Sequence, residues 1–177
     1  MARNGKPTRD KILSKTKNLV YCNGFSGTSI DQILDKTGIT KGAFFYHFKT
    51  KNVLAKALIE TYAKEDLSHL ESALQATETL KDTPLKRLLE FIQLFIDMMK
   101  KLEEPPSCLY ASYMYESNQF DSETLNIVAE SILEWRNALT ELLNSVLVEK
   151  KPKKRVDVQS LSDQFVDLFS IVGSSVL

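Results

Sequence analysis

The sequence lacks the features that would mark a secreted or membrane-spanning protein. It holds only two cysteines, Cys22 and Cys108, which are too few for a disulfide framework. The N-terminus is polar and basic, without the apolar stretch that a secretory signal requires. No segment approaches the roughly 18 consecutive apolar residues of a membrane span. We therefore expect a cytoplasmic protein that makes no membrane contact.

Signs of catalysis are equally scarce. The chain has two histidines, no Cys-x-x-Cys pair and no glycine-rich loop that could hold a phosphate. His69 follows Glu65 by four residues, but a helical di-metal site needs two Glu-x-x-His pairs, and these are absent. An exposed ion pair on one helix is the better interpretation of Glu65 and His69. The sequence predicts no enzyme, no cofactor and no metal site.

Charge is balanced overall but divided unevenly along the chain. Residues 1–56 carry a net charge of +8, and residues 57–177 carry −8. Only the N-terminal third is suited to a polyanion such as DNA. The basic run KKPKKR at 150–155 lies between two apolar helical patterns and contains a proline, so it indicates a solvated loop rather than a second DNA contact.

The stretch TSIDQILDKTGITKGAFFYHFKTK, residues 28–51, predicts two short helices joined by a tight turn. Thr28 or Ser29 can cap the first helix, and Gly38 ends it where a left-handed residue is needed. Thr40 can cap the second helix, whose Phe44 and Phe48 share one face. A preceding helix over about 8–22 completes a three-helix unit. This is the helix-turn-helix arrangement that enters the DNA major groove.

Helical periodicity continues through the rest of the chain. We expect helices from about 51 to 76, from 84 to before Pro105, over a short aromatic segment at 107–116, from 121 onward, and from 157 onward. The predicted fold is all-α, with a helix-turn-helix domain at 1–52 and an antiparallel helical bundle for regulation and dimerisation at 53–177.

The stretch GFSGTSIDQILDKTGITKGAFFYHFKTKNVL resembles the DNA-binding signature of the TetR family of bacterial transcriptional repressors, with similarity from about Arg9 to Leu54. The resemblance implies that Thr28, Thr40, Tyr46, His47 and Lys51 contact phosphates and that Lys41, Gly42 and Ala43 lie at the groove. Phe45 stands where the family usually has Tyr, which leaves only an apolar contact, for example to a thymine methyl. The expected DNA-binding residues are Thr28, Ser29, Thr40, Lys41, Gly42, Ala43, Phe45, Tyr46, His47 and Lys51.

Reading an operator generally requires two half-sites, so we expect a homodimer. Apolar residues on the last helical segment are the candidates for its interface: Phe165, Val166, Phe169 and Val172. The alternative is that these residues cover only their own core. Family members usually close with two dimerising helices, whereas only one is evident here.

We expect a repressor that binds double-stranded operator DNA and is released from it by a small apolar or aromatic effector. Its candidate pocket residues are Phe91, Phe95, Met98, Met99, Cys108, Tyr110, Tyr113, Met114, Glu116, Trp135 and Leu139, with Glu116 or a Tyr hydroxyl as polar anchor. Ordinary core packing is the alternative for each. Two other functions stay open: a repressor that senses electrophiles or oxidants through Cys108, and a helical adaptor that binds only protein.

Overall fold

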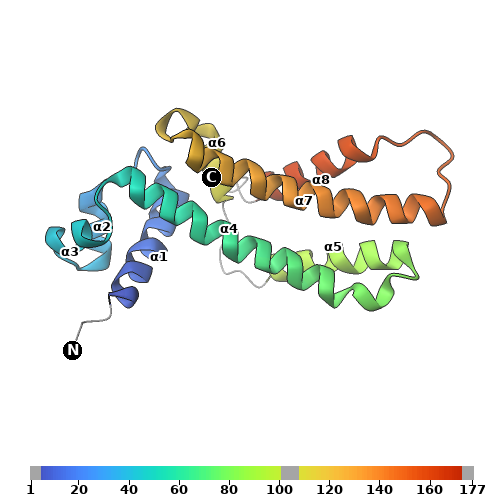
Figure 1. Ribbon diagram of the computed structural model, residues 1–177, viewed down its shortest axis with the longest axis horizontal. Coiled ribbons are helices and arrows are strands. Elements are labelled where there is room, and N and C mark those ends of the chain that lie inside the picture. The colour runs from blue at the N-terminus through green and yellow to red at the C-terminus, as the bar shows by residue number, and fades with distance from the viewer. Residues whose placement is uncertain (1–4, 101–107, 173–177) are drawn as a thin grey trace. The chain divides into compact units, whose positions relative to one another are not determined.

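The computed structural model describes residues 5–100 and 108–172, with the side chains of Met99 and residues 169–172 excepted. Over these residues the protein is helical and contains no strand, which confirms the predicted all-α class. The elements, in chain order, are α1 Lys6–Asn23, α2 Ile30–Thr37, α3 Lys41–His47, α4 Lys51–Ala76, the 3-10 helix η1 Glu78–Leu80, α5 Pro84–Lys100, α6 Leu109–Tyr115, the 3-10 helix η2 Ser117–Gln119, α7 Ser122–Glu149 and α8 Val158–Val172 (Figure 1).

The chain forms two compact units. The first comprises Met1–Ala63 and Leu109–Val128, and the second comprises Lys64–Cys108 and Ala129–Leu177. The first unit is larger than the expected domain at 1–52, because α6 and the start of α7 pack with the N-terminal helices. The reason is a long-range contact that no local pattern reveals: Tyr113 is fully buried, and its hydroxyl donates to the Ala55 carbonyl at 2.7 Å.

The core of the first unit is built from the inward faces of its helices. α1 packs against both α2 and α6. The buried side chains include the expected aromatic pair Phe44 and Phe48 and the loop residue Phe25. Its fully or almost fully buried apolar members are Ile12, Leu13, Val20, Phe25, Ile33, Phe44, Phe48, Leu54, Ala55, Leu58, Ile59, Leu109, Tyr113 and Val128. Removing this much apolar area from water holds the three N-terminal helices in one arrangement.

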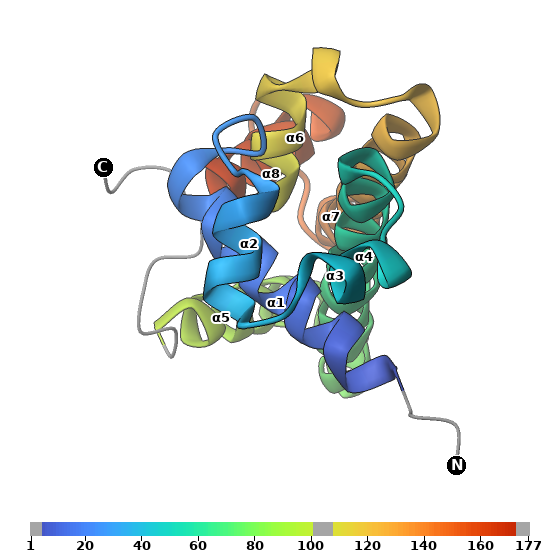
Figure 2. The same ribbon diagram turned by 90° about the vertical axis from the view of Figure 1, so that its left-hand side faces the viewer.

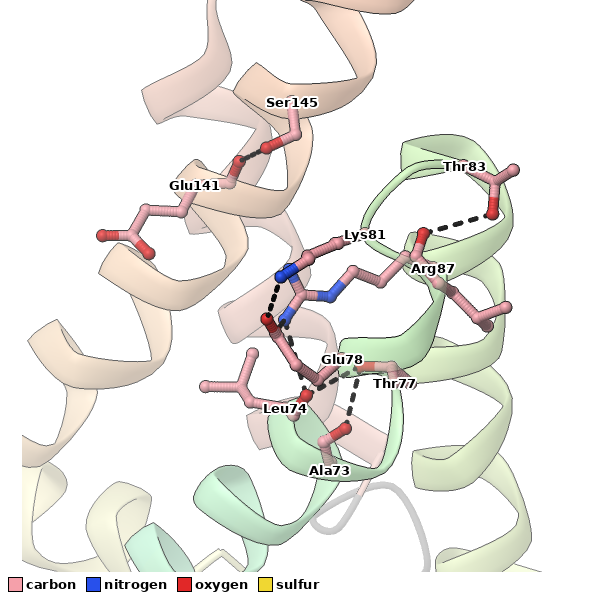
Figure 3. Close-up of polar contacts among 10 residues, drawn as sticks. Ala73, Leu74, Thr77, Glu78, Lys81, Thr83, Arg87, Glu141 and Ser145 are labelled. Atoms are coloured by element: carbon pink, nitrogen blue, oxygen red, sulfur yellow. Dashed lines mark hydrogen bonds and ion pairs between the residues drawn. The ribbon is translucent and has the colours of Figure 1, made fainter.

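The second unit is a bundle of the later part of α4, α5, the later part of α7, and α8. Its core joins Leu70, Leu88, Phe91, Trp135 and Leu139. Polar contacts close the turn from α4 to α5 (Figure 3). There the Arg87 guanidinium reaches Glu78 at 2.7 Å and the Leu74 carbonyl at 3.4 Å, and Thr77 donates back to the Ala73 carbonyl at 3.0 Å.

α8 packs on this core through part of its apolar surface. Phe165 and Val166 are half-buried against the cluster, whereas Leu168 is 54% exposed. The side chains of Phe169 and Val172, the other two residues expected at a dimer interface, lie outside the described part of the chain. All of residues 150–155 are exposed in the segment between α7 and α8, where the sequence predicts a loop.

Membrane-spanning helices and metal clusters do not occur among the described residues. None of their helices is both long and apolar enough to cross a membrane. Nor do three or more of their His, Cys, Asp and Glu side chains gather in a way that would suit a metal ion.

Candidate DNA-binding site

The first helix of the expected pair, α2, is fixed at both ends by local chemistry. Ser29 accepts from the Gln32 amide at 3.2 Å, and the Gln32 side chain accepts from the Ser29 amide at 2.7 Å, which forms a complete capping box. At the other end Gly38 has φ 64° and ψ 24°, and its amide donates to the Leu34 carbonyl. This left-handed glycine ends α2 and turns the chain toward α3.

Burial sorts the residues of α3 into two faces. Thr40 caps the helix by accepting from the Ala43 amide at 3.2 Å. Phe44 and the following Phe48 are buried, while Lys41 and Gly42 are exposed. Figure 2 shows α2 and α3 side by side at one surface of the first unit. The helix therefore presents a cationic, sterically open N-terminal end to solvent, as a groove-reading helix must.

Aromatic side chains follow on the same helix. Tyr46 is 76% exposed, and its ring makes an edge contact with His47 at 5.1 Å between centroids. Phe45 is half-buried and packs edge-on against Phe44 at 5.3 Å. Tyr46 thus has a hydroxyl in solvent that is able to reach a phosphate, whereas Phe45 offers only part of an apolar ring.

Two of the residues expected to contact phosphates make hydrogen bonds within the protein. The Thr28 side chain is fully buried, and its hydroxyl donates to the Gly24 carbonyl at 2.7 Å, so a phosphate contact by this residue stays a prediction that the burial of its hydroxyl does not favour. Lys51 donates to the Phe25 carbonyl at 2.6 Å and lies 4.5 Å from the centre of the Phe25 ring. Burial lowers the pKa of Lys51, while the nearby Glu116 carboxylate opposes that shift. Both residues fix the loop between α1 and α2.

Glu116, the expected polar anchor of a ligand pocket, binds that same loop. Its two carboxylate oxygens accept from the Phe25 amide and the Ser26 amide, each at 2.7 Å. Burial alone would raise the pKa of Glu116, but hydrogen bonds from Ser26 and Phe25 and the charge of Lys51 lower it below its ordinary value. Each oxygen accepts a hydrogen bond from the loop, and the role of ligand anchor for Glu116 stays a prediction.

The other expected pocket residues divide between the two units. Tyr110, Tyr113 and Met114 belong to the first unit, where Tyr110 packs edge-on against Tyr62 and Met114 is 58% exposed. Cys108 is half-buried directly before α6, and the side chain of Met99 lies outside the described residues. In the second unit one aromatic cluster brings together the remaining five, Phe91, Phe95, Met98, Trp135 and Leu139.

Two polar contacts of these sites were missed by sequence reasoning. The Trp135 indole N–H donates to the Asp66 carboxylate at 2.7 Å, and the loop amides of Phe25 and Ser26 bind Glu116. The sequence contained only a weak signal for the first contact, namely an acidic residue, Asp66, next to the apolar positions of a long helix. The sequence contained no signal for the second contact, because every residue except proline has a backbone N–H and the residue types do not show which of these groups binds Glu116.

Comparison with known proteins agrees with the helix-turn-helix geometry and extends it to the bundle. Residues 12–58 match the bacterial regulatory proteins of the tetR family, and residues 84–174 match the tetracyclin repressor-like C-terminal domain. The chain belongs to the TetR family. The second match alone spans half of the chain, which identifies the helical bundle as well as the N-terminal unit.

Individual relatives of this TetR-family chain agree. An uncharacterized HTH-type transcriptional regulator from Lactococcus lactis subsp. lactis is 36% identical over 89 residues, which cover 50% of this chain and 45% of that protein. The repressor NemR of Escherichia coli K12 is 27% identical over 71 residues, 40% of this chain and 36% of that protein. The chain thus spans less than half the length of these curated relatives.

Solved structures extend the likeness in fold to nearly the whole chain. A TetR-family regulator from Agrobacterium tumefaciens aligns with a TM-score of 0.76 at 20% identity, covering 97% of this chain and 88% of that one. At this level of identity the alignment shows a shared fold and nothing about ligands.

Proposed function

We propose that this protein is a sequence-specific, DNA-binding transcriptional repressor that reads its operator through α3. The observation that carries the proposal is the division of α3 by burial: Phe44 and Phe48 lock one face into the core, while Lys41, Gly42 and Tyr46 stand exposed on the other. The capped turn at Gly38 fixes this helix relative to α2. A rigid, cationic helix with small residues at its start suits the major groove.

Selection of bound fragments from a random pool of duplex DNA tests this function. We expect a recurrent motif with two related halves, and an affinity for that motif that falls steeply as salt rises, because cationic contacts release counterions from the phosphates. An adaptor that binds only protein predicts no selected motif. Equal affinity for all duplexes would also defeat the proposal, since it would leave non-specific charge attraction as the whole effect.

We further propose that a small apolar or aromatic effector binds in the second unit and lowers DNA affinity. The supporting observation is the cluster of Phe91, Phe95 and Trp135, in which the rings of Phe95 and Trp135 meet edge-on at 4.6 Å. Rings of this kind suit a planar apolar ligand, and Asp66, which accepts the indole N–H, supplies a polar group beside them.

Trp135 is the only tryptophan in the chain and therefore reports on this cluster by its own fluorescence. Compounds that release DNA are expected to change Trp135 emission over the same concentration range. Glu149→Gln, an exposed change at the far end of α7, serves as the control and should leave both responses intact. If effectors release DNA while Trp135 emission stays constant and Phe91→Ala responds normally, the effector site is not in this cluster.

A further inference from the structure

Three interactions connect α6 and its flanking residues to the helices of the first unit. The Glu116 carboxylate accepts from the amides of Phe25 and Ser26, each at 2.7 Å. The buried Tyr113 hydroxyl donates to the Ala55 carbonyl of α4 at 2.7 Å. The Tyr113 ring stacks on Phe120 at 4.3 Å with 6° between planes, and Phe120 also contacts Phe25 at 4.9 Å. One short segment thus contacts both the α1–α2 loop and α4.

The α1–α2 loop needs such a partner. α1 ends at Asn23 and α2 begins at Ile30, so the amides of Phe25 and Ser26 are outside both helices and have no helical acceptor. The loop carbonyls are held from the other side, since Lys51 donates to the Phe25 carbonyl and Thr28 to that of Gly24. Charged acceptors make stronger hydrogen bonds than neutral ones, so the carboxylate is the dominant partner of these two amides.

Room for this carboxylate is made by Gly24. This residue has φ 69°, and a Cβ built there would collide with a Glu116 oxygen. The loop therefore combines a glycine that lets the carboxylate approach with two adjacent amides that bind it. Ser29, which caps α2, follows three residues after Ser26, so the loop conformation sets where α2 begins.

The geometry points to Glu116 as a positioning residue that latches the α1–α2 loop to α6 and so holds the helix-turn-helix pair in its DNA-binding form. This inference rests on the proposed function as a DNA-binding regulator and adds to it one specific coupling point. The latch is the pair of hydrogen bonds from Phe25 and Ser26 to Glu116. A displacement of α6 would break the latch and release the loop, and DNA affinity would fall without any contact between Glu116 and DNA.

The direction in which one mutation changes operator affinity distinguishes this role from a purely electrostatic effect. Glu116→Gln removes a negative charge, and lowering the negative charge of a DNA-binding unit ordinarily strengthens its attraction to DNA. The latch predicts the opposite result, because the NH2 group that replaces one carboxylate oxygen in Gln cannot accept from the backbone amide that this oxygen binds. We expect operator affinity to fall about tenfold, with the slope of affinity against salt unchanged because no phosphate contact is lost.

Glu130→Gln is the matched control, since it makes the same charge change at an exposed glutamate of α7. It should leave operator affinity unchanged or slightly higher. Amide hydrogen exchange supplies a second measurement that needs no DNA. In Glu116→Gln the amides of Phe25 and Ser26 should exchange about tenfold faster, while those of the α4 interior stay protected.

These measurements distinguish a failure of the proposed function from a failure of the latch. If the wild-type protein selects no DNA motif, the proposed function fails. If it binds an operator and Glu116→Gln binds as tightly or more tightly, the latch is wrong. Faster exchange throughout the unit in Glu116→Gln would also overturn the inference, because it would show general destabilisation in place of a local release of the loop.

Discussion

The individual residues expected to bind DNA fall into two groups, according to whether their side chains are exposed or already hydrogen-bonded within the protein. Lys41 is exposed at the start of α3, and Tyr46 is exposed on the same helix. Thr28 and Lys51 instead hold the α1–α2 loop through hydrogen bonds to the Gly24 and Phe25 carbonyls. We therefore expect mutations at the first pair to alter DNA binding directly, and mutations at the second pair to act through the shape of the loop.

Lys41→Ala tests the first pair. The change removes a solvent-exposed cation at the open end of α3 and leaves the Thr40 cap and the Phe44 contact in place. Operator affinity should fall by about 1–3 kcal/mol if Lys41 reads a base edge, with relaxed preference at one position of the motif. Thermal stability should stay within about 0.5 kcal/mol of the wild type. Lys64→Ala, an exposed lysine of α4 in the second unit, is the control and should bind normally.

The contribution of Glu116 should depend on pH in a defined direction. Its folded-state pKa is lowered, so the stabilisation is fully present above the ordinary glutamate pKa of about 4.3 and is lost as pH falls through the folded value. The difference in unfolding free energy between wild type and Glu116→Gln, about 1–1.5 kcal/mol for this pair of partly exposed hydrogen bonds, should shrink toward zero in acid.

Urea unfolding of both proteins from pH 7 to pH 3 measures this difference. The pKa of Asp121 is also lowered, by hydrogen bonds from Thr124, but Asp121 titrates in both proteins and cancels in the comparison. A difference that is constant with pH would show that the charge of Glu116 does not matter to the loop.

At the scale of single helices, the sequence predicted the features that depend on residues close together in the chain, such as the helix ends. Ser29, Gly38 and Thr40 act over three or four residues, and their caps appear where their chemistry requires them. The start of α7 is similar, since Asp121 accepts from the Thr124 amide. The placement of α6 could not be predicted in this way. Glu116 is 91 residues from Phe25 in the chain, and aromatic spacing alone fitted a ligand pocket equally well.

Glycine substitutions on either side of Thr40 should have opposite effects on folding. Gly38→Ala forces a side chain into a left-handed conformation at φ 64°, although no atom lies within 4 Å of the new Cβ, so we expect a loss of about 1 kcal/mol from backbone strain alone. Gly42→Ala lies in the exposed first turn of α3 with ordinary helical geometry and should stabilise by up to about 1 kcal/mol.

Chemical denaturation of both variants measures these changes in unfolding free energy. For Gly42→Ala, the effect on DNA binding should be opposite to the effect on stability. Gly42→Ala should bind the operator more weakly despite its greater stability, because the added methyl group fills space at the groove-facing end of α3. If Gly42→Ala binds as tightly as wild type, the close approach of α3 to the bases at this position is not needed.

At the scale of the whole molecule, the uneven distribution of charge and the helical bundle both bear on specific operator binding. The N-terminal third is cationic and holds the exposed face of α3, whereas the remaining chain is anionic and should not compete for the same DNA. A single small unit makes too few base contacts for operator specificity, so we expect two copies to bind one operator. The sequence suggested the last helix as the dimer surface, which stays a prediction, but which of its residues cover the core depends on packing. Phe165 and Val166 face the cluster, while Leu168 remains 54% exposed.

We propose that two copies pair through this exposed part of α8, and we expect Leu168→Asp to prevent that pairing without unfolding the monomer. An exposed carboxylate costs little in the monomer but would be buried unpaired between two copies. In sedimentation at micromolar concentration the wild type should run as a dimer and the variant as a monomer, and operator affinity should fall about a hundredfold because the two half-sites are no longer engaged together. Val148→Asp places the same charge at an 85% exposed position on α7 and should remain dimeric. If the wild type sediments as a monomer but still selects a two-part motif, the copies assemble only on DNA. In that case Leu168→Asp should lower the cooperativity of operator binding and leave the mass measured in solution unchanged.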